Sequence, residues 1–215
     1  MLTGGQLAGG NPAAPRAADD FYATDPRTVE LFLERARPHA GFNGTIWECA
    51  CGDGNISRVL EQRFPMARVI STDLVYRGYG QGGVDFLTSG QTADMIMTNP
   101  PFSRINQFIE HALDQARRHV IFLARIQLLE GVERRKLLDR TPLRFIYVHS
   151  ARQATWKDGQ PFDQHGKRWA TTMCLAWFVW DKAYRGEPVI RLLCLYKHRR
   201  ILWAITLKTW MRCTR

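Results

Sequence analysis

The sequence lacks the features that mark several classes of protein. It holds no run of about 18 apolar residues, so we expect no membrane-spanning helix. Residues 1–18 are rich in Gly, Ala and Pro but lack the basic start and apolar run of a secretion signal, which predicts a flexible leader. Its five cysteines form no CxxC pair, and no nearby histidine completes a zinc set. We therefore expect reduced thiols, a cytoplasmic location and no metal site.

Acidic residues are absent from one region, and this weakens a simple argument from charge. The formal net charge of +10 suggests an anionic partner. Residues 191–215 hold seven Lys and Arg and no acidic residue, and without them the net charge is +3. The length fits one domain, predicted over 19–191 and followed by a basic tail, 192–215. For this tail a nucleic-acid clamp, a membrane-surface helix and sequence foreign to the fold all stay open.

Short apolar runs alternate with amphipathic stretches along the predicted domain. Helices are predicted at 26–37, 56–64, 103–117 and 130–139, and strands at 45–47, 67–72, 93–98, 119–124 and 143–149. Two later apolar runs, 173–180 and 189–195, are too close together for an intervening helix, so we expect an antiparallel hairpin at the sheet edge. The alternation predicts an α/β fold with a mostly parallel sheet and helices on both faces.

A glycine-rich turn follows the first of these strands. The segment runs Glu-Cys-Ala-Cys-Gly-Asp-Gly from Glu48, and its glycines, Gly52 and Gly54, allow a tight turn and close approach of a ligand. Glu48 could receive a cationic group. A dinucleotide fingerprint would have a third glycine where Ser57 stands, and no Walker lysine is present. The pattern favours a nucleoside cofactor that carries no phosphate.

Two acidic residues follow at points where the cofactor would continue. Asp73 ends the next strand, where a carboxylate can bind both ribose hydroxyls. Asp85 could accept a hydrogen bond from an adenine amino group, and Phe86 could flank the ring. Taken singly, either acid could equally be a cap or turn residue. Because ligands of parallel sheets bind at the carboxyl ends of the strands, these residues together predict one site.

The most informative motif is Asn99-Pro100-Pro101-Phe102, at the end of a predicted strand. The two prolines fix the backbone, so the Asn99 side-chain oxygen and the Pro100 carbonyl form a rigid pair of acceptors. The lone pair of an exocyclic amine is delocalised into its ring, and two acceptors gripping its hydrogens would return density to the nitrogen. Phe102 offers a stacking face, worth about 1–3 kcal/mol for a base. The alternative is an ordinary proline turn.

These motifs together resemble those of the N6-adenine DNA methyltransferases, in particular the small enzymes of phages and bacteria. The resemblance spans about residues 20–191 and includes the E-x-x-x-G-x-G of Glu48 to Gly54, the two acids with Phe86, and the NPPF motif. It implies a Rossmann-like class I fold with a seven-stranded sheet and S-adenosylmethionine as cofactor. It also implies transfer of a methyl group to adenine N6 in DNA. Base flipping is implied if the DNA is double-stranded.

The resemblance assigns roles to residues outside these motifs. Thr24 and Pro26 match the segment that touches the methionine end of the cofactor, although Asp25 between them departs from the pattern. Trp156 matches the aromatic residue that lies across the flipped base and would face Phe102, where the family usually has Phe. That Trp156 merely covers an edge is the alternative.

Several alternatives to a DNA methyltransferase stay open. An RNA methyltransferase acting on adenine or guanine amino groups and a protein-glutamine methyltransferase use a similar turn. A catalytically idle nucleic-acid-binding subunit is a third possibility, which the intact Asn99 and glycines disfavour. The family's separate target-recognition domain has no room in 215 residues. We therefore expect low specificity or a partner subunit of a restriction–modification system.

Overall fold

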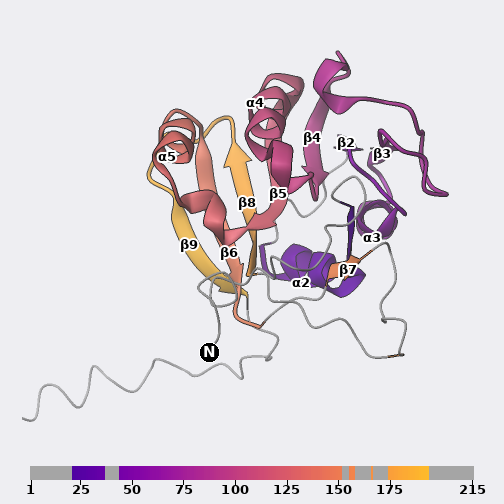
Figure 1. The fold of residues 1–215 in the computed structure, drawn as a ribbon, viewed down its shortest axis with the longest axis horizontal. Helices are drawn as coiled ribbons and strands as arrows, with labels where there is room; N and C mark the ends of the chain where they lie inside the picture. Colours follow the sequence, from indigo (N-terminus) through magenta and orange to yellow (C-terminus); the bar gives the residue numbers. More distant parts are fainter. Residues whose placement is uncertain (1–20, 37–43, 152–154, 158–165, 167–173, 194–215) are drawn as a thin grey trace, which may run out of the picture.

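The computed structural model describes residues 21–36, 44–151, 155–157, 166 and 174–193 (Figure 1). The predicted leader and residues 194–215 of the predicted tail lie outside these ranges. No helix within the described ranges is long and apolar enough to cross a membrane.

A seven-stranded sheet forms the centre of the molecule. Its order is β3-β2-β4-β5-β8-β6-β9, and all neighbouring strands are parallel except β8, which is antiparallel to both β5 and β6. The strands are β2 (Thr45–Glu48), β3 (Arg68–Ser71), β4 (Ala93–Thr98), β5 (Ala116–Arg125), β6 (Leu143–His149), β8 (Leu175–Asp181) and β9 (Val189–Leu193). Two short strands, β1 (Tyr22–Thr24) and β7 (Thr155–Lys157), pair antiparallel in a separate sheet.

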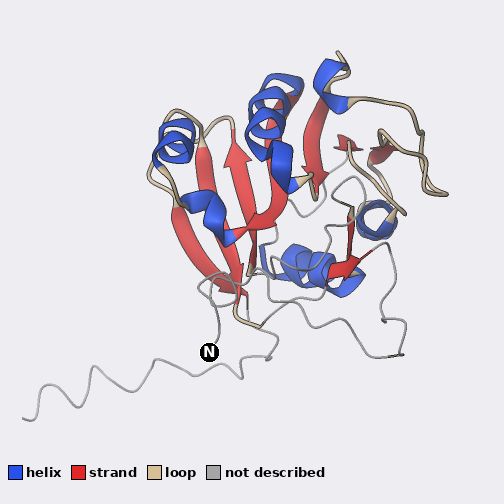
Figure 2. Cartoon of the chain, in the orientation of Figure 1, coloured by secondary structure: helices blue, strands red, loops and turns tan. Residues whose placement is uncertain are grey.

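Helices cover both faces of the seven-stranded sheet (Figures 1 and 2). The α-helices are α2 (Pro26–Ala36), α3 (Asn55–Arg63), α4 (Ile105–Gln115) and α5 (Val132–Asp139). Three single 3₁₀ turns are η2 (Phe86–Thr88), η3 (Phe102–Arg104) and η4 (Ile126–Leu129). Buried side chains of α2 and α3 join one apolar cluster, and those of α4 and α5 join the other. The predicted α/β class with a mostly parallel sheet is thus confirmed.

Alternation along the strands divides the core into these two layers. On β5, Val120 and Phe122 face the α4 side, whereas Ile121 and Leu123 face the α2 side. Aromatic rings pack tightly in the second layer, where Phe32 of α2 lies 4.7 Å from the Trp177 ring. Because the central strands are apolar on both faces, helices must cover both sides of the sheet.

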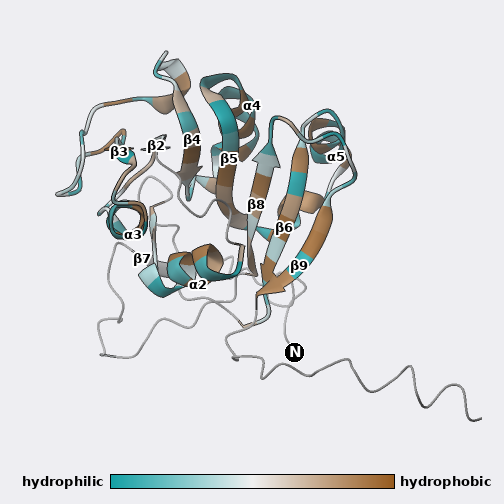
Figure 3. Cartoon of the chain, turned by 180° about the vertical axis from the view of Figure 1, so that it is seen from behind, coloured by the Kyte–Doolittle hydropathy of each residue, from teal (hydrophilic) through white to brown (hydrophobic). Residues whose placement is uncertain are grey.

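The predicted pairing of the last two strands was wrong. The two segments form β8 and β9, but β8 lies between β5 and β6, and β9 pairs parallel with β6. Every residue of β8 is buried, which fits a strand with neighbours on both sides, and Figure 3 shows its mostly apolar colouring. The first four residues of β9 are exposed, as an edge position allows. Closeness in sequence suggested a hairpin, whereas burial of β8 on both faces favours the interior.

Candidate active site

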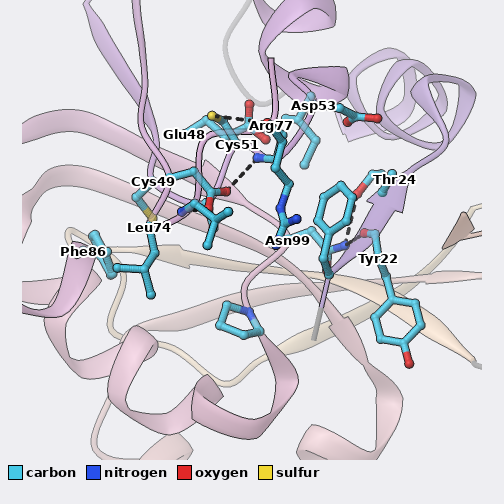
Figure 4. Close-up of a pocket in the computed structure, with 18 of the residues that line it drawn as sticks. Tyr22, Thr24, Glu48, Cys49, Cys51, Asp53, Leu74, Arg77, Phe86 and Asn99 are labelled. Carbon is cyan, nitrogen blue, oxygen red and sulfur yellow. Dashed lines mark hydrogen bonds between the residues drawn. The ribbon is translucent and has the colours of Figure 1, made fainter. Parts of the chain in front are cut away.

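A cavity of about 440 Å³ lies at the carboxyl ends of β2, β3 and β4 (Figure 4). This is the edge at which open parallel sheets bind ligands. The predicted site residues that line it are Thr24, Glu48, Gly52, Asp73, Asp85, Phe86, Asn99 and Pro101. Pro26, Gly54, Pro100 and Phe102 are not among its lining residues. Residues far apart in the sequence therefore meet in one cavity, as their positions at strand ends predicted.

The glycine turn has a backbone that side chains would disrupt. Gly52 and Gly54 have φ angles of +54° and +84°, in the region that L residues rarely adopt. A Cβ on Gly52 would lie 2.4 Å from the Phe21 ring, and one on Gly54 would lie 2.3 Å from the Tyr79 ring. Both glycines are thus required by conformation and by contact, and the turn can approach a ligand closely.

The two predicted cofactor acids also hold the backbone in place. Asp73 accepts hydrogen bonds from Gly52 N at 2.8 Å and from Val75 N at 2.9 Å, which ties the glycine turn to the end of β3. Asp85 accepts from Leu87 N at 3.0 Å and caps η2. An ionised carboxylate has about four acceptor positions, so each can still receive a ligand hydrogen. Asp73 and Asp85 therefore do have the turn and cap roles that the sequence analysis gave as alternatives. These roles leave each carboxylate able to bind a ligand.

Phe86 belongs mainly to the core. Its side chain is 2% exposed and packs against Trp47 and Phe108, with ring centroids 5.1 and 4.9 Å away. It also lines the cavity, so its edge is available to flank a planar group. The residue connects the cavity wall to the apolar layer beneath it.

Glu48 is buried beneath the glycine turn. Its carboxylate accepts a hydrogen bond from the Ser57 hydroxyl, whose oxygen lies 2.6 Å from Ser71 Oγ. Burial raises the pKa of Glu48 well above its ordinary value, because the charged form has lost its water. A cation in the cavity would favour the charged form. Ser57, in place of a third glycine, thus supports this carboxyl.

The Asn99 carboxamide is held in one orientation. Its Nδ2 donates to the Tyr22 carbonyl at 3.0 Å and lies 3.2 Å from Thr24 Oγ1. Its Oδ1 is buried and has no hydrogen-bond partner among the residues that the structure describes. A buried oxygen without a partner is costly in a stable protein and calls for an explanation. Asn99 lines the cavity, so its side chain carries an unused acceptor at the cavity wall.

The Phe102 side chain contacts two groups that the sequence analysis did not identify. The Tyr22 ring is nearly parallel to it, with centroids 6.4 Å apart and planes inclined by 18°. The Arg125 guanidinium lies 4.8 Å from its centroid. Tyr22 stands two residues before Thr24, and this closeness to a predicted site residue was the signal in the sequence that could have identified it. The side chain of Trp156 lies outside the described structure, although its backbone pairs with Ala23, next to Tyr22.

A second contact missed by the sequence analysis lies over the glycine turn. Arg77, from the connection between β3 and β4, stacks on the Phe21 ring at 4.3 Å, and both residues line the cavity. Figure 4 shows the Arg77 side chain extending toward Asn99. Within the described ranges, no group of three or more His, Cys, Asp or Glu is placed to hold a metal ion.

Comparisons with known proteins show which solved structures have a similar fold. No family model matches the chain, and no curated protein matches it. A modification subunit of a putative type I restriction enzyme from Vibrio vulnificus has a TM-score of 0.58 at 10% identity, covering 83% of this chain and 48% of its own. The type I restriction-modification methyltransferase subunit from Streptococcus thermophilus has 0.57 at 10%, covering 79% and 47%. A putative RNA methyltransferase from Pyrococcus horikoshii has 0.56 at 13%, covering 85% and 99%.

The fold is that of the Rossmann-like class I methyltransferases. The chain spans about half the length of the two restriction-system subunits that it resembles. At identities of 10 to 13% the likeness establishes the fold, so the reaction has to be argued from the site itself.

Proposed function

We propose that this protein transfers a methyl group from S-adenosylmethionine to the exocyclic N6 amino group of adenine in DNA. The single observation that carries the proposal is the Asn99 carboxamide, whose Nδ2 is held by β1 and whose buried Oδ1 has no partner within the described part of the chain. An amino group on a planar ring is a donor that fits this acceptor.

The cavity suits the cofactor in size and chemistry. A volume of about 440 Å³ lies within the range typical of small-molecule sites. Asp73 would receive the ribose hydroxyls and Asp85 the adenine amino group, with Phe86 against the ring. Glu48, and Thr24 with the neighbouring Pro26, would face the cationic methionine end. When bound, S-adenosylmethionine supplies an electrophilic methyl group.

The residues of the Asn-Pro-Pro-Phe turn would then activate the substrate. Asn99 Oδ1 and the Pro100 carbonyl would accept the two N6 hydrogens and direct the nitrogen lone pair at the methyl group. The proton becomes acidic only as the methyl group arrives, so no strong base is required. Phe102 would stack on the adenine, and Trp156 would lie across it. An adenine in a duplex must leave the stack to reach this turn.

Two features support a nucleic-acid substrate, and the resemblance of the NPPF motif to that of the N6-adenine DNA methyltransferases favours DNA within this class. The fold resembles two subunits of type I restriction systems. The exposed side chains of Arg104 and Arg125 flank the turn. We infer a role in the cytoplasm of a bacterial or phage-infected cell, with target recognition weak or supplied by a partner subunit.

The test is incubation with tritiated S-adenosylmethionine and a panel of DNA, RNA and protein substrates, followed by digestion. We expect labelled N6-methyladenine from DNA. Labelled RNA would instead identify an RNA methyltransferase, and labelled glutamine a protein methyltransferase. Cofactor binding by calorimetry without any labelled product would favour the idle subunit.

A further inference from the structure

Strand β1 holds the catalytic carboxamide. The two groups that contact Asn99 Nδ2 are the Tyr22 carbonyl at 3.0 Å and the Thr24 hydroxyl at 3.2 Å. A carbonyl oxygen can only accept, so the amide nitrogen must face β1 and the amide oxygen must face away from it. Figure 4 shows Tyr22 and Thr24 on one side of Asn99, joined to it by these bonds.

We propose that Thr24 is a positioning residue for methyl transfer, which rests on the proposed function. Nδ2 has two hydrogens, and the Tyr22 carbonyl and the Thr24 hydroxyl together can accept both. A carboxamide turned by 180° would present its hydrogens to the substrate amino group, and two donors would then face each other. The Tyr22 carbonyl decides which way the amide faces, because a carbonyl can only accept. The Thr24 hydroxyl adds the second acceptor for Nδ2, and with both hydrogens held the carboxamide keeps Oδ1 directed toward the substrate.

Thr24 is itself fixed by its surroundings. Its side chain is 4% exposed, and its backbone pairs with β7. The next residue, Asp25, is 5% exposed, accepts from Arg27 N at 3.0 Å and forms an ion pair with the Arg27 guanidinium. The start of α2 thus anchors the end of β1. The departure from the family pattern at Asp25 therefore has a structural use here: it secures the residue that orients Asn99.

The decisive variant is Thr24→Val, which keeps the branched shape and removes the hydroxyl. We expect its kcat at saturating S-adenosylmethionine to fall about tenfold. Because Thr24 is also assigned to the methionine end of the cofactor, affinity for S-adenosylhomocysteine should fall as well, but by clearly less than kcat. Thr24→Ser keeps the hydroxyl and should recover most of the loss. The matched control is Thr141→Val, because the Thr141 hydroxyl donates to the Leu138 carbonyl far from the cavity. This control should lower thermal stability and leave kcat unchanged.

A readout that needs no turnover separates this inference from the proposed function. In side-chain ¹⁵N–¹H spectra, Thr24→Val should shift one of the two Asn99 amide protons upfield, and Thr24→Ser should shift it far less. An unchanged Asn99 spectrum, or a loss of S-adenosylhomocysteine affinity equal to the loss of kcat, would overturn the positioning role. Should the spectra respond as expected while no substrate is methylated, the positioning contact would stand and the proposed function would fail.

Discussion

At the scale of the residue, several side chains of the site have two roles. Asp73 fixes the glycine turn through Gly52 N and lines the cavity. Ser57, in turn, supports a buried carboxyl. Asn99 differs, because within the described structure its nitrogen is hydrogen-bonded and its oxygen is not. At residues with two roles, a substitution distinguishes the effect on folding from the effect on the reaction only if it removes one of the two contacts and keeps the other.

Asn99→Ala should abolish most methyl transfer. We expect kcat to fall by about a hundredfold or more, because a preorganised polar group is lost from the reacting centre. Affinity for S-adenosylhomocysteine should remain nearly intact by calorimetry. The matched control is Asn106→Ala on α4, which does not line the cavity and should retain activity. Turnover of Asn99→Ala within about tenfold of the wild type would contradict the assigned role.

Glu48 should make both stability and cofactor binding depend on pH. Burial raises its pKa in the folded state, so the folded protein binds a proton more tightly than the unfolded chain. The contribution is fully present below the unfolded pKa and is lost as the pH rises through the higher folded pKa. The isosteric Glu48→Gln variant should lack this loss in denaturant titrations at increasing pH.

Cofactor affinity should respond to Glu48 in the opposite direction. A cationic cofactor favours the charged carboxylate, so affinity for S-adenosylmethionine should rise with pH in the wild type. In Glu48→Gln, affinity should be lower and nearly independent of pH in calorimetric titrations. The same pH dependence in both proteins would show that Glu48 does not face the cation.

At the scale of the element, β1 connects the cofactor cavity to the stacking face. Its Tyr22 carbonyl and Thr24 hydroxyl hold Asn99, and its Tyr22 ring lies beside Phe102. Among the described strands it pairs with β7 alone, outside the main sheet.

Tyr22→Ala should weaken substrate binding more than cofactor binding. The variant removes the ring and keeps the backbone carbonyl, so the support of Asn99 remains. Loss of one stacking surface of about 1–3 kcal/mol would raise KM for the nucleic acid by about five- to 150-fold. Tyr22→Phe keeps the ring and should resemble the wild type. An equal loss of S-adenosylhomocysteine affinity in Tyr22→Ala would instead assign the ring to the cofactor.

At the scale of the whole molecule, stability depends on the central strands. β8 is buried along its full length between β5 and β6, and Trp177 on it is completely buried against Phe32 of α2. Because this strand joins the two halves of the sheet, its packing contributes to global unfolding. The edge strand β9, by contrast, exposes Ile190.

Trp177→Ala should lower the free energy of unfolding by about 3–5 kcal/mol, through lost burial and the cavity left behind. Ile190 is 60% exposed, so Ile190→Ala should change the free energy of unfolding by about 0.5 kcal/mol or less. Both values can be measured by urea titration at constant pH. Comparable losses in the two variants would mean that β8 is no more central to stability than β9.

The layers of the fold, and the strand ends at which the candidate site residues lie, follow from local patterns in the sequence. The near-continuous apolar runs of β4 and β5 require cover on both faces, and the bounds of β4 and β6 match the prediction. Gly52, Asp73 and Asn99 lie at the predicted sheet edge because parallel strands place their carboxyl ends together. The position of each of these residues can be predicted locally, because each one follows directly or closely on a strand that its own apolar run identifies.

How distant segments meet depends on tertiary packing, which no local pattern specifies. The place of β8 between β5 and β6 depends on burial by neighbours on both sides, and no local pattern encodes those neighbours. The bonds from Asn99 to Tyr22 and Thr24 join residues more than 70 positions apart. Whether the amide oxygen faces the site is set by which acceptors surround the amide nitrogen. The Asn-Pro-Pro-Phe motif therefore predicts that Asn99 supplies an acceptor, and the contacts with β1 set the orientation of its amide group.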